Sequence, residues 1–257
     1  MLLADFHVHS TWSDGSLSIP EVVDLFGKSG HDVIAITDHV VNADSFLGKA
    51  AHGLKLSVTR DNFDAYRSEI DREARRAWDT YRMLVIAGCE LTRNAATGAR
   101  SAHALAVGLD RFVSADGPME EVLVRARDAG AVTVACHPNE QSDWFGNTFY
   151  LWKRRREIGA LVDRWELACR WDLFPPVARA RLPYVASSDF HKPAHLWAWK
   201  TLLPCDRTPE AVFAALRSKA ELGATRLPAP LAERPPIDEV PHRGCGLFPG
   251  LAAAQPA

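Results

Sequence analysis

The sequence predicts an α/β fold, in which seven or eight strand–helix units suggest a closed, TIM-like barrel with a metal site at the C-terminal ends of its strands. Two observations predict the fold class: short apolar runs alternate with helical patterns, and the runs are numerous enough to close a barrel. Strands separated by crossover helices are expected to pair in parallel. A third observation, the position of histidine and acidic residues beside these runs, predicts the metal site.

The expected strands are short, rich in Val, Ile and Leu, and bounded by Gly, Pro or polar residues, as buried strands are. They cover residues 2–8, 33–37, 83–89, 104–109, 132–136, 164–168 and 184–186, with 201–203 as an eighth candidate. The expected helices cover residues 19–29, 61–81, 118–129 and 208–218. Ser18 and Thr208 are suitable N-caps, and Pro209 suits a first helical position.

Three regions define the expected domain organisation. Residues 1–227 form one catalytic domain, which includes a long excursion over residues 40–82 after the second strand. The excursion is expected to be a lid or side helix, because its second half has the charge pattern of a solvated helix. Residues 228–257 form a Pro-rich tail that is expected to wrap the surface or to be disordered.

Composition narrows the functional classes. The net charge is −2, from 30 Lys and Arg against 32 Asp and Glu, which lacks the basic excess of a dedicated nucleic-acid binder. The five cysteines are scattered and form no CxxC pair, which favours reduced thiols. We find no signal peptide and no apolar run that could span a membrane, so a cytoplasmic location is expected.

Six of the ten histidines lie at strand ends with acidic companions. These residues are His7, His9, His39, Glu90, His103, His137, Asp189 and His191. Residues i and i+2 of a strand project to the same face, so His7 and His9 can bind one ion. The carboxyl ends of parallel strands meet at one face, where distant residues converge.

Imidazole nitrogens with carboxylate oxygens suit Zn²⁺, Mn²⁺ or Fe²⁺, and the lack of cysteine pairs argues against a closed structural zinc site. The alternative is that each histidine is an ordinary buried residue satisfied by hydrogen bonds. We favour the metal interpretation, because burying so many titratable groups without an ion would be costly. The other four histidines, including His31 and His195, are interpreted as ordinary residues.

Several short motifs occur in a fixed order along residues 1–205. They are Asp5-Phe6-His7-Val8-His9-Ser10, Ser13-Asp14-Gly15, Ala35-Ile36-Thr37-Asp38-His39, Gly88-Cys89-Glu90-Leu91-Thr92, His103, His137-Pro138 and Ser188-Asp189-Phe190-His191. Together they resemble the PHP (polymerase and histidinol phosphatase) domain family. The resemblance implies a distorted (β/α)7 barrel, three divalent ions and phosphoester hydrolysis.

The resemblance also implies which residues would hold each ion. One ion would be held by His7, His9, Glu90 and Asp189. Glu90 would bridge to a second ion held by His103 and His137. A third would be held by Asp14, His39 and His191. Asp38 is expected to orient a ligand imidazole rather than to bind an ion.

The expected function is hydrolysis of a phosphomonoester of a small metabolite or nucleotide by attack of a metal-bridging hydroxide. Glu90, Asp14 and His191 are the expected catalytic residues, although a metal-bound water could also protonate the leaving oxygen. Candidate phosphate-binding residues are Arg93, Arg100, Arg170 and Lys192, each of which can also be interpreted as a solvated loop cation.

Three alternatives remain open at the level of the sequence. The first is a single-strand nuclease or exonuclease, supported locally only by the basic run Lys153-Arg154-Arg155-Arg156, with nucleic acid not favoured as a partner. The second is a non-catalytic metal-binding module. The third is hydrolysis of a C–N or C–O bond by the same ligand set.

Overall fold

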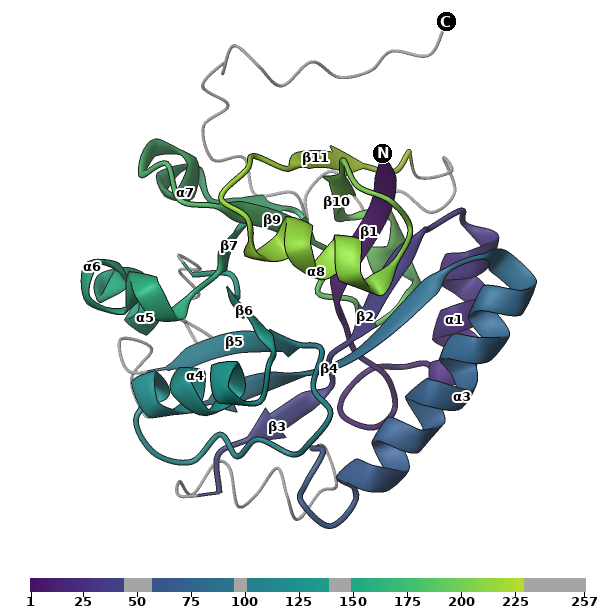
Figure 1. Cartoon of the computed structure of the whole chain (residues 1–257), viewed down its shortest axis with the longest axis horizontal. Coiled ribbons are helices and arrows are strands. Elements are labelled where there is room, and N and C mark those ends of the chain that lie inside the picture. Colours follow the sequence, from purple (N-terminus) through teal and green to yellow (C-terminus); the bar gives the residue numbers. More distant parts are fainter. Residues whose placement is uncertain (44–56, 95–100, 139–148, 229–257) are drawn as a thin grey trace, which may run out of the picture.

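The strands of the computed structural model form one mixed, curled sheet (Figure 1). The model describes residues 1–43, 57–94, 101–138 and 149–228. Its strands are β1 (Leu2–Val8), β2 (Val33–Ile36), β3 (His39–Val41), β4 (Leu84–Arg93), β5 (Ala102–Val107), β6 (Val132–Ala135), β7 (Arg164–Cys169), β8 (Asp172–Leu173), β9 (Tyr184–Ser187), β10 (Trp199–Leu203) and β11 (Gly223–Arg226).

All four expected helices are present within two residues of their expected bounds, together with shorter helices that the sequence analysis did not anticipate. The helices are α1 (Ile19–Lys28), α3 (Phe63–Tyr81), α4 (Met119–Asp128), α5 (Phe149–Lys153), α6 (Arg155–Ile158), α7 (Pro175–Arg179) and α8 (Pro209–Arg217), with the 3-10 turns η2 (Gly159–Leu161) and η3 (Pro193–Trp197). Thr208 caps α8 as expected, because its hydroxyl accepts a hydrogen bond from the backbone N–H of Ala211.

The order of the strands is β11-β10-β1-β2-β4-β5-β6-β7-β8, with β3 beside β4 and β9 beside β7. The pairs β1–β2, β2–β4, β6–β7 and β7–β9 are parallel, as expected of crossover connections. An isolated parallel bridge joins Val8, at the end of β1, to Phe190, which follows β9. The sheet therefore curls until its seventh expected strand lies beside its first.

The expectation of uniformly parallel pairing is wrong at β5, which runs antiparallel to both β4 and β6. The physical reason is the short connection from Arg93 to Ala102, since a parallel crossover needs a dozen or more residues. This reversal has a consequence for His103. The residue opens β5, yet the reversed strand brings it to the end of the sheet where the neighbouring strands finish.

A second correction concerns Glu90, which was expected to follow the third strand. It lies inside β4, which continues to Arg93 because its second half finds new partners on both sides. There β3 pairs in parallel with His39 opposite Glu90, and β5 pairs antiparallel with Leu105 opposite Glu90. The longer strand thus brings histidine-bearing strands to both sides of this carboxylate.

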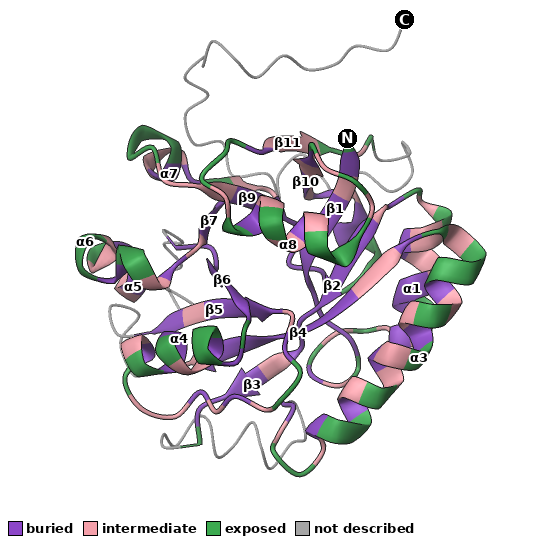
Figure 2. Cartoon of the chain, in the orientation of Figure 1, coloured by how far each residue is buried: buried purple, intermediate pink, exposed green. Residues whose placement is uncertain are grey.

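Apolar side chains cover both faces of the sheet, as the continuous hydrophobic runs predict. Ile34 and Ile36 of β2 join a cluster with α1, α3 and α4, while Val33 and Ala35 join a second cluster with α8. Most strand residues are buried, with β8 and β11 as exceptions, and the outer sides of the helices are exposed (Figure 2). The polar residues described below are therefore inside a well-packed protein.

The excursion over residues 40–82 contains most of β3 and the whole of α3, which packs beside α1 (Figure 1). Tyr66 of α3 anchors this helix, because its hydroxyl lies within hydrogen-bonding distance of the backbone of Ile36, Asp38 and Gly88. The expected tail lies almost entirely outside the described residues. In the part of the chain that the structure describes, no helix is both long and apolar enough to span a membrane.

Candidate metal centre

Nine side chains that the sequence analysis selected converge at one end of the sheet. Their possible ligand atoms form three groups, in each of which the atoms lie within 4.8 Å of one another. The groups are His7, His9 and Glu90; Glu90, His103 and His137; and His9, Asp14, His39 and His191. Asp189 completes the set beside the first group. Residues from both ends of the described chain thus meet in one place.

Glu90 lies at the centre of the cluster, and its two oxygens face different histidines. Oε1 lies 2.8 Å from Nδ1 of His103 and 3.6 Å from Nε2 of His137. Oε2 lies 3.2 Å from Nε2 of His7 and 3.3 Å from Nε2 of His9. A carboxylate placed in this way can serve two cation sites at once.

Asp189 also divides its two oxygens between different neighbours. Oδ1 lies 3.3 Å from Nε2 of His7 and 3.4 Å from Nε2 of His9, on the side of the cluster. Oδ2 pairs with the guanidinium of Arg170 at 2.8 Å. One oxygen is therefore directed toward the histidines, and the other is fixed by an arginine.

Asp14 reaches the third group from a tight turn after β1. Oδ1 lies 3.5 Å from Nε2 of His39, and Oδ2 lies 3.3 Å from Nε2 of His191. The next residue must be glycine, because a Cβ at position 15 would lie 2.6 Å from the carbonyl oxygen of His9. The Ser13-Asp14-Gly15 motif thus folds the carboxylate back over the end of its own strand.

The histidines are oriented by hydrogen bonds at the nitrogen that faces away from the nearest carboxylates of the cluster. Nδ1 of His7 lies 2.9 Å from Glu166, and Nε2 of His103 lies 3.2 Å from Asn94. Nδ1 of His191 lies 2.8 Å from the backbone carbonyl of Asp189. Such outer partners fix the tautomer and leave the inner nitrogen with a lone pair for a cation.

Glu166, which the sequence analysis missed, supports two of the selected histidines. Besides its contact with His7, it accepts a hydrogen bond of 2.6 Å from the backbone N–H of His137 through Oε2. The side chain is fully buried in β7. The available signal was a single glutamate inside an apolar strand, where a buried carboxylate requires partners.

Asp38 supports the cluster differently from the expected direct contact with an imidazole. Its carboxylate accepts hydrogen bonds from the backbone N–H and hydroxyl of Ser10 and from the hydroxyl of Ser13. The hydroxyl of Ser13 in turn lies 3.4 Å from Nδ1 of His9. Asp38 therefore orders the turn that carries Asp14 and acts on an imidazole only through Ser13.

Three residues at this end of the sheet have left-handed backbones, which are uncommon outside glycine. They are His137 with φ 26°, Arg170 with φ 49° and Asp189 with φ 47°. Each lies one or two residues after the end of a strand, namely β6, β7 or β9. Strain that persists in this way is concentrated at functional sites.

Opposite charges dominate the electrostatics of the cluster. Burial alone lowers the pKa of His39, but Glu90 and Asp14 outweigh it and raise the pKa to about 10. Burial likewise opposes charge on Glu90, yet the surrounding histidines hold its pKa well below the usual range. The carboxylates thus stay ionised and attract positive charge, which either protons on the imidazoles or bound cations can supply.

The donor set fits divalent cations. Nε2 of His7 and Nε2 of His9 are buried and make no hydrogen bond within the described part of the chain, and Oε1 of Glu90 and Nδ1 of His103 are buried against each other at 2.8 Å. Buried polar atoms are normally paired, so convergent unpaired donors and acceptors need a partner. A divalent cation is bound by this combination of imidazole and carboxylate groups.

The four candidate phosphate-binding residues have different environments. Arg170 lines the site but is held against Asp189. Arg93 donates a hydrogen bond to the backbone carbonyl of Gly117. Lys192 is exposed beside His191. Arg100 lies outside the described residues.

His31 and His195 have the environments of ordinary buried residues. Burial and the nearby Lys200 lower the pKa of His31 to about 3, and Nδ1 lies 3.2 Å from the carbonyl of Phe26. Nδ1 of His195 accepts a hydrogen bond from the backbone N–H of His191, so this histidine supports the cluster from outside.

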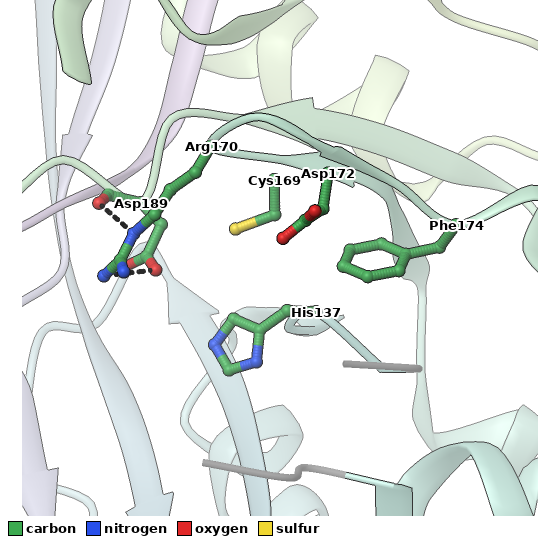
Figure 3. A pocket seen from close by; sticks show the side chains of 6 residues that line it. All are labelled: His137, Cys169, Arg170, Asp172, Phe174 and Asp189. Carbon is green, nitrogen blue, oxygen red and sulfur yellow. Dashed lines mark hydrogen bonds and ion pairs between the residues drawn. The ribbon is translucent and has the colours of Figure 1, made fainter. Parts of the chain in front are cut away.

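A pocket of about 200 Å³, including the part open to solvent, borders the cluster (Figure 3). Its lining residues are His137, Cys169, Arg170, Asp172, Phe174 and Asp189. Two of them, His137 and Asp189, belong to the nine residues described above. The pocket is therefore a shallow, solvent-open depression beside the candidate cation sites.

The fold and the site together define a class of protein, namely an α/β protein with a histidine and carboxylate cluster suited to several divalent cations. Residues 5–130 match the family model described as the PHP domain. Residues 5–130 thus carry a PHP domain, as the sequence motifs predict.

Two further comparisons give similar proteins. A solved structure from Bacteroides vulgatus ATCC 8482, described as a two-domain protein containing a predicted PHP-like metal-dependent phosphoesterase, aligns with a TM-score of 0.61 at 22% identity. The alignment covers 88% of this chain and 64% of that chain. The DNA polymerase/3'-5' exonuclease PolX of Bacillus subtilis is 40% identical over 70 residues, which is 26% of this chain and 11% of that protein. The chain thus spans less than two thirds of either relative.

Proposed function

We propose that the protein is a metal-dependent phosphoesterase that hydrolyses a phosphomonoester of a small metabolite or nucleotide. The observation that carries the proposal is the convergence of three candidate cation sites, two of which share the carboxylate of Glu90. The PHP domain supports a hydrolase, and so does the description of the Bacteroides protein as a predicted phosphoesterase.

The proposed site holds three divalent ions, which can be Zn²⁺, Mn²⁺ or Fe²⁺. The first is assigned to His7, His9, Glu90 and Asp189, the second to Glu90, His103 and His137, and the third to Asp14, His39 and His191. When bound, such ions polarise a phosphoryl oxygen and make water a stronger nucleophile at neutral pH. We also assign residues 1–227 to one distorted (β/α)7 barrel, supported by the bridge between Val8 and Phe190.

The protein residues have distinct proposed roles in this reaction. Glu90 keeps the first two sites together. Asp14 and His191 are the more accessible members of the cluster, with side chains 41% and 17% exposed, and they lie 3.3 Å apart. As ligands of the third ion, Oδ2 of Asp14 and Nε2 of His191 would hold no proton to donate, so we propose that these two side chains position a water that supplies the proton required by the leaving oxygen.

A second candidate function, cleavage of single-stranded nucleic acid, is favoured by the partial match to PolX. The basic run gives it little support. Arg154 pairs with Glu120 and Glu157, and the guanidinium of Arg155 lies 4.3 Å from the ring of Trp152. These contacts leave less free positive charge for a nucleic-acid backbone than the sequence suggests.

The test is a turnover panel with the full chain loaded with Mn²⁺ or Zn²⁺. The panel contains an aryl phosphate, sugar phosphates, mononucleotides, 3′,5′-bisphosphates and single-stranded oligonucleotides. The proposal predicts hydrolysis of at least one phosphomonoester, lost in Glu90→Ala and retained in the exposed control Glu210→Gln. No hydrolysis of any phosphomonoester at full metal occupancy would overturn it. Cleavage of oligonucleotides alone, weakening steeply with salt, would establish the nuclease instead.

A further inference from the structure

The hairpin formed by β7 and β8 brings two opposite charges to the wall of the pocket. Cys169 pairs with Asp172 across the hairpin, so that Arg170 lies in the turn and Asp172 begins the returning strand. Both side chains line the pocket, with the phenyl ring of Phe174 beside them (Figure 3). One short hairpin thus determines the charge of this wall.

The arginine and the aspartate face different parts of the site. Figure 3 shows the guanidinium of Arg170 turned toward Asp189, to which it is paired at 2.8 Å. The carboxylate of Asp172 points between Cys169 and Phe174, above His137. It makes no hydrogen bond or ion pair with any described residue. Asp172 therefore contributes a free negative charge to a half-buried surface.

An unpaired carboxylate in a pocket has a definite preference among ligands. It repels a phosphate or carboxylate and attracts a hydrogen-bond donor, most strongly a cationic one. The phosphoryl group of a substrate is therefore disfavoured beside Asp172. It belongs at the candidate cation sites, to which His137 and Asp189 contribute. The part of the substrate that reaches Asp172 is the alcohol.

We propose that Asp172 is a specificity-determining residue, which selects phosphoesters whose alcohol part carries an ammonium or hydroxyl donor and rejects those with a second anionic group there. The inference rests on the proposed phosphoesterase function, because it takes the phosphoryl group to lie at the metal centre. The ring of Phe174, which lines the same wall, can pack against the carbon chain of such an alcohol.

Three stable phosphonates of similar length test this inference by binding rather than by turnover. They are 2-aminoethylphosphonate, propylphosphonate and phosphonoacetate, whose terminal groups are an ammonium, a methyl and a carboxylate. Calorimetric titration of the Mn²⁺-loaded full chain gives their Kd values. We expect the Kd of 2-aminoethylphosphonate to be lower than that of propylphosphonate by about tenfold or more, because one charged hydrogen bond has an effect of this size. Phosphonoacetate is expected to bind most weakly.

Variants of Asp172 make the assignment specific. Asp172→Asn keeps the shape and removes the charge, so the preference for the ammonium over the carboxylate should collapse, and Asp172→Lys should reverse it. Asp128→Asn, at the exposed end of α4, should keep the wild-type order. Equal affinities in the wild type, no binding of any phosphonate, or an unchanged order in Asp172→Asn would overturn the inference.

Turnover of p-nitrophenyl phosphate by the same preparation separates this inference from the proposed function. Its alcohol part carries neither a donor nor an anion. If it is hydrolysed while the phosphonates show no preference, the inference is wrong and the phosphoesterase assignment remains. If the preference is observed but no phosphomonoester is hydrolysed, the assignment as a phosphoesterase is wrong.

Discussion

Oε1 of Glu166 lies 2.9 Å from Nδ1 of His7, and both side chains are fully buried. A carboxylate at this position keeps the imidazole protonated at Nδ1 and leaves Nε2 for a cation. The other oxygen of Glu166 holds the backbone of His137, which belongs to a different candidate cation site. One residue outside the ligand set thus positions two members of it.

Glu166→Gln is expected to weaken the binding of divalent ions by about 10-fold to 100-fold, the usual effect of losing an outer partner of a metal-binding histidine. The amide retains the size of the side chain but offers only one acceptor oxygen for two donors. Competition with a chromophoric chelator measures the affinity, with Glu210→Gln as the control. An affinity equal to that of the wild type would show that Glu166 does not position the ligands.

Gly15→Ala should lower both stability and activity. The added Cβ would meet the carbonyl of His9 at 2.6 Å, so the turn that carries Asp14 must move. Crowding of this kind costs about 1–3 kcal/mol of unfolding free energy. Gly159→Ala is the matched control, because a Cβ at that position meets nothing within 4 Å. Chemical denaturation and turnover of an aryl phosphate measure the two effects, and equal results for the two variants would contradict the role of Gly15.

His31 predicts a loss of stability as the pH falls. Burial and Lys200 lower its folded pKa to about 3, whereas the unfolded chain titrates near the usual value of about 6.5. Below that value the unfolded state binds a proton that the folded state excludes, so stability decreases until the pH reaches the folded pKa. This residue should account for about 2 kcal/mol between pH 7.5 and pH 5.

The comparison of His31→Gln with the wild type isolates this contribution. Glutamine does not titrate, so the unfolding free energy of the variant should fall less over the same pH interval. Urea denaturation at each pH provides the two curves. Parallel curves would mean that His31 binds its proton equally well in the folded and unfolded states.

Arg164 is expected to be a major contributor to stability, although it lies outside the candidate metal centre. Its buried guanidinium donates hydrogen bonds to backbone carbonyls at the end of α8, including those of Ala215, Leu216 and Ser218. Arg164→Met leaves these carbonyls unpaired and should cost about 3 kcal/mol or more. Thermal unfolding checks this, and the exposed control Arg179→Met should change little. A similar small change in both would contradict the assigned role.

The sequence predicted the main elements because buried parallel strands and amphipathic helices have strong patterns. It did not predict the reversal of β5, because the direction of a strand depends on the length of the connection between Arg93 and Ala102 rather than on hydrophobicity. The short strands β8 and β11 were also missed. β8 has only two residues, too few for a pattern, and β11 reads Gly-Ala-Thr-Arg, which contains no apolar run.

The nine candidate ligands were found because histidines and acids beside strands form an unusual pattern, and because the motifs resemble a known family. Glu166 and Asp172 were missed for a different reason. Each is a single acidic residue, and its importance depends on which side chains the fold brings to it. Asp38 was selected for its position beside His39, but its contacts are with Ser10 and Ser13.

The count of bound metal ions tests the central claim most directly. Protein dialysed against Mn²⁺ or Zn²⁺ and freed of excess ion should contain about three ions per chain by elemental analysis, as a cluster with three candidate sites predicts. Glu90→Ala should lose most of this metal while it remains folded, and Glu210→Gln should retain it. Metal-free wild-type protein, or an equal metal content in Glu90→Ala, would contradict the account.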